Sequence, residues 1–128
     1  IQIEGKDGWA AKLPCWRKQT GLIVKFSGGR PITGYHIVMI TFVIVMFHFP
    51  FLFAHWTLAT EFLILGLMFE TFLLEDFLWF VFNPAFGIKK FRKGQIWWHV
   101  EWWGPFPSMY YYMIVVCVLF IVLSQLID

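Results

Sequence analysis

The chain has 128 residues, of which 59% are hydrophobic, 22% aromatic and only 14% charged, and its formal net charge is +2. Soluble domains average about 45–50% apolar and about 25% charged residues, and a chain this short has too much surface to bury so many aromatic side chains. The composition therefore excludes an ordinary soluble domain and favours a protein that uses lipid as its solvent. The small net charge, with no basic stretch that interleaves aromatic residues, excludes nucleic acid as a partner.

Residues 1–34 form a polar segment that glycine and proline interrupt repeatedly. Basic side chains are scattered through it, and Trp9 and Trp16 lie among them. Tryptophan rings near Lys and Arg suit the headgroup layer of a membrane. We therefore expect an amino-terminal interfacial segment, with a short helix or hairpin at 22–26.

A first transmembrane helix is predicted at about 35–53. Residues 37–47 are nearly all apolar, and with its flanks the segment is long enough to cross about 30 Å of hydrocarbon at 1.5 Å per residue. Pro50 would free the carbonyl of Met46 and kink the end of this helix. The connection that follows is short and uncharged.

A second transmembrane helix is predicted at about 57–82. It ends at Asn83-Pro84, because the residue before a proline disfavours the helical conformation. Half of the eight acidic residues of the chain lie in this helix: Glu61, Glu70, Glu75 and Asp76.

The segment 84–108 is predicted to be an aromatic interfacial loop. Four basic residues (Lys89, Lys90, Arg92 and Lys93) precede the run Trp97-Trp98-His99-Val100-Glu101-Trp102-Trp103. A third transmembrane helix, at about 109–126, has no charged residue. We find no repeat and no second domain, so the predicted fold class is an all-α membrane protein with three transmembrane helices in a single membrane domain, residues 1–128.

The basic residues predict the orientation of the three helices. All ten Lys and Arg residues fall in 1–30 and 89–93, and none lies between the first two helices or after the third. In a three-span chain these two segments share one side, which the positive-inside rule assigns to the cytoplasm. The expected localisation is a multi-pass membrane protein with its amino terminus cytoplasmic and its carboxyl terminus on the opposite side.

Four carboxylates in one membrane helix need neutralising neighbours, because a charged side chain near the bilayer centre costs roughly 2.5–3.5 kcal/mol. Glu75 and Asp76 lie about two turns from the helix end, where an ion-pair network with Lys89, Lys90 and Arg92 is the simplest interpretation. Glu70, near the middle, must be protonated, paired or in contact with water. Three helices can hardly shield it, so we predict a homo-oligomer or a complex with other membrane subunits.

Histidines complete two predicted polar clusters if the first two helices form an antiparallel hairpin. The outer cluster contains His48, His55 and Glu61; the inner one contains His36, Glu75, Asp76 and His99, with Glu101 as a further member, and Glu70 lies between them. A simpler interpretation of His48 and His55 is that both bond carbonyls exposed by the Pro50 kink. His36 and His48 are also candidate axial ligands of a haem or chlorophyll.

Histidine and carboxylate together are ordinary ligands for Zn, Fe, Mn or Cu. The candidate metal ligands are His36, Glu70, Glu75, Asp76 and His99. No strong motif supports them, since the chain has no HExxH and no paired ExxH helices. At 100° per residue Glu70 points about opposite to Glu61, so one metal cannot gather all four acids.

The segment Leu74 to Gly87 (LEDFLWFVFNPAFG), followed by Trp97-Trp98-His99, resembles small prokaryotic integral membrane proteins of unknown function. The resemblance covers about a quarter of the chain. It implies that the Glu-Asp pair, the Asn-Pro helix end and the Trp-Trp-His loop belong together, and it implies no activity or residue role.

The leading functional hypothesis is a non-catalytic integral subunit of a homo-oligomer or larger membrane complex. One alternative is a metal-dependent membrane enzyme that acts on a lipid or a small apolar substrate, with the inner cluster as ligands. Another is a proton or cation pathway along Glu61, Glu70 and the Glu75-Asp76 pair.

Overall fold

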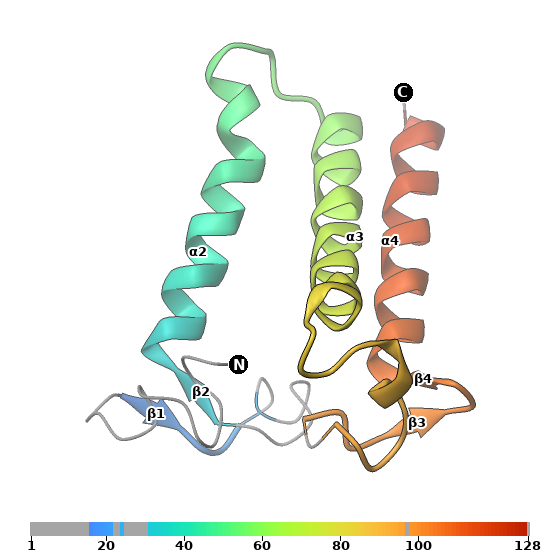
Figure 1. Ribbon diagram of the computed structural model, residues 1–128. Coiled ribbons are helices and arrows are strands. Elements are labelled where there is room, and N and C mark those ends of the chain that lie inside the picture. Colours follow the sequence, from blue (N-terminus) through green and yellow to red (C-terminus); the bar gives the residue numbers. More distant parts are fainter. Residues whose placement is uncertain (1–15, 22–23, 25–30, 97, 128) are drawn as a thin grey trace. The chain divides into compact units, whose positions relative to one another are not determined.

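The computed structural model describes residues 16–21, 24, 31–96 and 98–127 (Figure 1). Most of the segment predicted as a short helix or hairpin, 22–26, lies outside these residues, as does Trp9. The contacts of the chain divide it into two compact units, Ile1–Val43 and Ile44–Asp128, and each unit is described by itself.

In the first unit a two-residue strand pair precedes a long helix. Strand β1 (Arg17–Lys18) pairs antiparallel with β2 (Ile32–Thr33), with Arg17 opposite Thr33. Helix α2 (Gly34–His48) begins directly after β2 and continues into the second unit. The hydroxyl of Thr33 lies 3.5 Å from the N–H of His36, the position from which an N-cap residue accepts a hydrogen bond.

Helix α2 is apolar on every side, and none of its residues is buried. Pro50 ends its α-helical hydrogen bonding rather than kinking it: the chain tightens at His48 into the 3-10 helix η2 (Phe49–Leu52). The carbonyl of Pro50 then accepts from the N–H groups of Phe53 and Ala54, both at 3.0 Å. The combined segment Gly34–Leu52 is long and apolar enough to span a membrane.

Helix α3 (Leu58–Phe82) has a defined signal at each end. Thr57 caps its beginning, where the side-chain oxygen accepts from the N–H of Thr60 at 3.1 Å. Asn83 leaves the helical region at ψ 109°, as expected before a proline. Its side-chain oxygen then accepts from the N–H of Ala85 at 2.9 Å, which stabilises the turn out of the helix.

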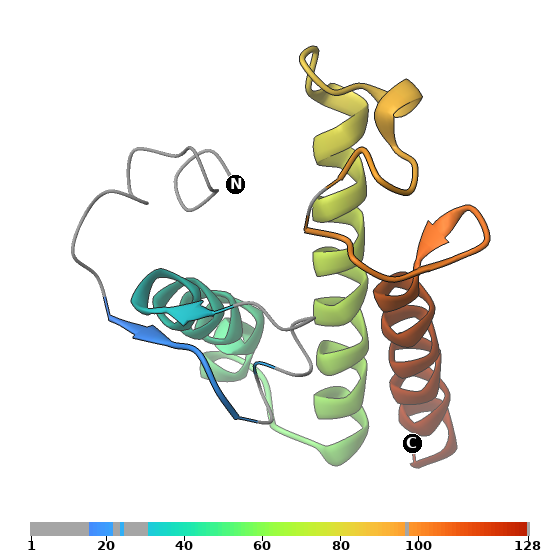
Figure 2. The same ribbon diagram turned by 90° about the horizontal axis from the view of Figure 1, so that it is seen from below.

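Helix α4 (Ser108–Ile127) runs antiparallel beside α3, and the two helices approach closely (Figures 1 and 2). A Cβ atom on Gly66 would lie 2.8 Å from Cγ1 of Ile121 and 3.3 Å from the carbonyl oxygen of Cys117. The buried side chains of α4 include the small residues Cys117 and Ser124. Small residues at the contact allow two backbones to come together, the usual way in which membrane helices pack.

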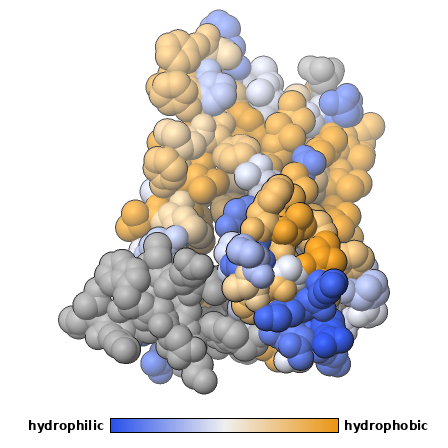
Figure 3. Space-filling model, in the orientation of Figure 1, coloured by the Kyte–Doolittle hydropathy of each residue, from blue (hydrophilic) through white to orange (hydrophobic). Residues whose placement is uncertain are grey.

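The exposed surface of α4 is apolar, for example at Ile114, Val118 and Val122. In the view of Figure 3, apolar residues cover much of the helical part of the chain. Like the α2–η2 segment, Ser108–Ile127 is long and apolar enough to cross a membrane. The structure thus confirms a mainly helical chain with three long helices, two of which pass this test.

The loop between α3 and α4 folds around an aromatic core at the end of α3. Phe80, Ile96 and Trp98 are buried in it, and partly buried aromatic side chains pack on them: Trp79, Phe86, Phe91 and Trp102. The loop contains the 3-10 helix η3 (Ile88–Lys90) and a hairpin of β3 (Trp102–Trp103) and β4 (Phe106–Pro107). Gly104, with φ 62°, occupies the hairpin turn, where two-residue loops require a positive φ.

Candidate functional site

Three side chains from three different elements meet near the carboxyl-terminal end of α3, close to the loop that follows it. Nε2 of His99, from the loop, lies 2.9 Å from Oδ2 of Asp76 on α3. The hydroxyl of Tyr110, in the first turns of α4, donates to the same oxygen at 2.6 Å. We call Asp76, His99 and Tyr110 the inner triad. Its hydrogen bonds connect both long helices of this unit to the loop.

The imidazole of His99 is enclosed by aromatic rings. Only 3% of its side chain is exposed, against 20% for Asp76. The rings of Phe80, Trp98, Trp102 and Tyr110 lie 5.8–6.3 Å from it, centre to centre. The backbone of His99 is fixed as well, because its carbonyl oxygen accepts from Nε1 of Trp102 at 2.8 Å.

A carboxylate that orients an imidazole is an arrangement that enzymes use for general bases and for metal ligands. In the inner triad the imidazole is closed off by the aromatic loop, so a substrate would have to displace packed rings to reach it. The geometry therefore suits a hydrogen-bonded contact that holds α3, α4 and the loop together better than it suits a catalytic centre.

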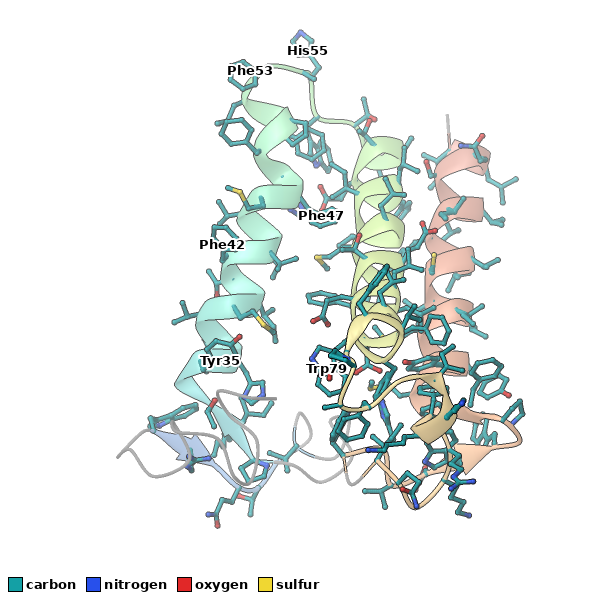
Figure 4. All side chains as sticks on the ribbon, viewed as in Figure 1. Tyr35, Phe42, Phe47, Phe53, His55 and Trp79 are labelled. Carbon is teal, nitrogen blue, oxygen red and sulfur yellow. The ribbon has the colours of Figure 1, made fainter. Side chains whose placement is uncertain are left out.

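A second polar group lies at the turn between η2 and α3. Nε2 of His48 lies 2.9 Å from Oε1 of Glu61, and Nε1 of Trp56 donates to Oε2 of Glu61 at 2.8 Å. We call His48, Trp56 and Glu61 the outer triad. Two of the three members of the predicted outer cluster, His48 and Glu61, are thus in contact. His55 is exposed at the same turn (Figure 4).

The outer triad requires a shared proton. Nδ1 of His48 lies 2.7 Å from the carbonyl oxygen of Ile44, which can only accept, so Nδ1 carries a hydrogen. Nε2 and the carboxylate of Glu61 can then bond only if one further proton lies between them. Whether histidine or glutamate holds that proton, the pair has no net charge. The carbonyl that His48 bonds belongs to Ile44 rather than to Met46, which Pro50 was expected to free.

Within the second unit, the other predicted ligands do not join these groups. Nδ1 of His36, in the first unit, accepts from the N–H of Thr33 at 3.2 Å and lies 2.8 Å from its hydroxyl. Glu70 and Glu75 are exposed, and no hydrogen bond or ion pair from a described residue reaches either carboxylate. The carbonyl oxygen of Glu101 accepts from the N–H of Ser108 at 3.0 Å.

The predicted ion pairs of Glu75 and Asp76 with Lys89, Lys90 and Arg92 do not form. Within the described ranges the two ion pairs of the chain both use histidine, His48 with Glu61 and His99 with Asp76. Asp76 is turned toward α4 and the loop, because Tyr110 and His99 offer donors there.

Of the four candidate metal ligands that lie in the second unit, the structure brings Asp76 and His99 together. Among the residues that it describes, no group of three or more His, Cys, Asp or Glu side chains could hold a metal ion.

Sequence reasoning missed Tyr110 and Trp56. The run of three tyrosines in a mainly apolar helix was a signal for Tyr110, since a buried hydroxyl usually finds a hydrogen-bond partner. Trp56 is exposed, so the same argument gave no signal for it. Their particular partners depend on how α4 and the turn fold back onto α3.

Comparison with protein-family models, with curated proteins and with solved structures found no match for this chain.

Proposed function

We propose that this chain is a three-span integral membrane subunit, non-catalytic, that assembles with further copies of itself or with other membrane subunits. The observation that carries the proposal is the position of Glu70. It has twelve helical residues before it and twelve after it in α3, and its side chain is exposed.

The assignment of α3 as a third span follows from its length and its neighbour. Its 25 residues extend over about 37 Å at 1.5 Å per residue, more than the roughly 30 Å of a hydrocarbon core. Because α3 packs antiparallel against α4, a membrane that contains α4 contains α3 as well. Two of its four acids are already hydrogen-bonded, Glu61 in the outer triad and Asp76 in the inner triad.

The remaining two acids lie on a continuous exposed surface of α3. We call this surface the acidic stripe; its members are exposed and lie within about half of the helix circumference: Leu67, Glu70, Thr71, Leu74, Glu75 and Leu78. A carboxylate at the depth of Glu70 is unfavourable by roughly 2.5–3.5 kcal/mol when it faces lipid alone. A partner subunit that covers the stripe removes this penalty by supplying a hydrogen-bond donor or enclosed water.

The orientation in this proposal follows from charge. Every Lys and Arg lies in residues 1–30 or 89–93, so the amino terminus and the aromatic loop face the cytoplasm and the carboxyl terminus faces the other side.

A photo-crosslinking experiment tests the proposal. A photoreactive amino acid replaces Leu74 in the acidic stripe or, as the matched control, Ile114 on α4. These side chains are 46% and 47% exposed, and they lie at similar depth because Tyr110 contacts Asp76. We expect crosslinks from position 74 to a second copy or another membrane protein, and only lipid adducts from position 114.

The same experiment with Glu70→Leu and Glu70→Gln examines the role of the carboxyl group. Leucine should lower the crosslinking yield at position 74, because it removes the polar contact, whereas glutamine should largely keep it. Crosslinks from position 74 to lipid alone, or only to residues of the same chain, would refute the assembly.

A further inference from the structure

We propose that the loop after α3 is a binding site for the headgroup phosphates of anionic phospholipids. The site consists of Lys89, Lys90, Arg92 and Lys93, which we call the basic loop. The inference rests on the proposed membrane insertion but not on the proposed assembly, because it concerns a different surface.

The positive charge of the basic loop is not compensated within the described part of the chain. All four side chains are exposed. The two ion pairs seen among the described residues involve histidines and use none of these cations. Figure 3 shows a strongly hydrophilic patch at the lower right, below the ends of α3 and α4. Four cations in five positions produce a local field that attracts anions.

The loop is held in shape from within. The ring of Phe91 packs into the aromatic core, 4.9 Å from the ring of Phe80 and 5.4 Å from that of Trp102. Backbone hydrogen bonds close successive turns on both sides of it, from Lys90 to Gly87 at 3.1 Å and from Gln95 to Arg92 at 3.1 Å. With Phe91 fixed inward, the cations on either side of it are presented outward on an ordered backbone.

The four basic side chains differ in whether they already have a partner within the chain. Nζ of Lys90 donates to the carbonyl oxygen of Ala85 at 2.7 Å and lies 5.6 Å from the centre of the Phe86 ring. Lys90 therefore stabilises the loop. Lys89, Arg92 and Lys93 have no such contact among the described residues, so their donors can bind a ligand.

Exposed apolar side chains in the same stretch of the chain, at the end of α3 and directly before Lys89, point to a lipid rather than to free phosphate. Phe82, at the end of α3, is 77% exposed and Ile88 is 55% exposed. At a membrane surface such side chains enter the acyl region while neighbouring Lys and Arg reach the headgroups. Clustered cations directly after a membrane helix on its cytoplasmic side are a recognised pattern for anionic lipid binding.

The test uses the full chain in nanodiscs of equimolar phosphatidylcholine and phosphatidylglycerol, with the lipids that stay bound counted by native mass spectrometry. We expect phosphatidylglycerol to be enriched over phosphatidylcholine. The triple variant Lys89→Gln/Arg92→Gln/Lys93→Gln should lower this enrichment at least fivefold, since each cation near an anionic surface contributes to binding. The charge-conserving variant Lys89→Arg/Arg92→Lys/Lys93→Arg should retain it, because the attraction depends on charge.

Adding inorganic phosphate distinguishes the two sources of the anion. If the apolar neighbours contribute to binding, phosphate at millimolar concentration should leave the enrichment of phosphatidylglycerol unchanged. If phosphate abolished the enrichment, the site would be one for the free ion, and the lipid assignment would be overturned. Equal retention of both lipids by the wild-type chain, or full enrichment in the glutamine variant, would also overturn it. Carbonate extraction of each variant from membranes separates this result from the proposed function: a chain that inserts without lipid preference contradicts only the lipid site.

Discussion

Asp76 shows how one partly buried carboxylate can organise several elements. One of its oxygens receives hydrogen bonds from His99 and from Tyr110, so the end of α3, the aromatic loop and the start of α4 share a single acceptor. Without the carboxylate of Asp76, Nε2 of His99 and the hydroxyl of Tyr110 would have no hydrogen-bond partner, because the aromatic surroundings offer few other acceptors. A buried polar group without a partner costs about 1–3 kcal/mol.

We therefore expect Asp76→Ala to destabilise the protein by at least about 2 kcal/mol, and Tyr110→Phe by about 1 kcal/mol, because the phenylalanine removes only one hydrogen bond. Steric-trapping or detergent unfolding measurements of the free energy of unfolding check both values. Tyr111→Phe is the control, since the hydroxyl of Tyr111 donates to the carbonyl of Trp103 in an exposed position. Equal losses for the Tyr110 and Tyr111 variants would contradict a special role for the inner triad.

The outer triad makes a prediction about proton positions. Nδ1 of His48 should carry a hydrogen in the wild-type chain, because its partner is the carbonyl of Ile44. In Glu61→Gln, Nε2 should accept from the amide without a shared proton, which leaves a neutral histidine of the same tautomer. Nitrogen chemical shifts of labelled His48 in lipid report both states. A wild-type Nδ1 without a hydrogen would show that the contact with Ile44 is not a hydrogen bond.

At the scale of elements, the packing of α3 on α4 depends on Gly66. A Cβ at this position would lie 2.8 Å from the side-chain atom Cγ1 of Ile121 and 3.3 Å from the carbonyl oxygen of Cys117, so a side chain does not fit between Gly66 and α4. In the proposed membrane location, the apolar faces of both helices would be equally soluble in lipid apart or together, so close van der Waals contact would have to hold the pair.

Gly66→Ala should therefore loosen the helix pair and destabilise the protein by about 1–3 kcal/mol, as overpacking does. Adding Ile121→Ala removes the clashing atom and should restore part of the loss. Gly34→Ala is the matched control, because a Cβ there meets nothing within 4 Å. The free energy of unfolding of these three variants, compared with that of the wild-type chain, forms the test. An unchanged free energy of unfolding in Gly66→Ala would show that the helices are less tightly packed than described.

At the scale of the whole molecule, three spans and their orientation can be checked with single cysteines. Starting from a variant in which Cys15 and Cys117 are replaced by serine or alanine, His55→Cys and Gln95→Cys each place one thiol at an exposed position. We expect a membrane-impermeant maleimide to label position 55 only from outside the cell and position 95 only in inverted vesicles. Labelling of both positions from one side would contradict α3 as a span.

The positions of the helices were predictable because each signal is local. These signals act through neighbours in sequence: the apolar run after residue 36, the helix end at Asn83-Pro84 and the uncharged carboxyl-terminal segment. Helices α3 and α4 begin and end within a few residues of the predicted bounds. Helix α2 begins within a few residues of its predicted start, but it ends at His48 and continues as η2. The pairing of His48 with Glu61 was also predictable, because a short turn brings these residues to one depth.

The partners of the remaining polar residues were decided by the tertiary structure. Asp76 was expected to use cations of the nearby loop, yet Tyr110, 34 positions away, and the buried His99 take their place. The charge pattern by itself shows that four acids in one membrane helix need neutralising neighbours, because the free-energy cost of burying a carboxylate in lipid depends on residue type and depth. Which residue becomes the hydrogen-bond partner of each acid depends on the direction in which its side chain leaves α3. Residues of α4 and of the aromatic loop reach Asp76, whereas Glu70 stays exposed.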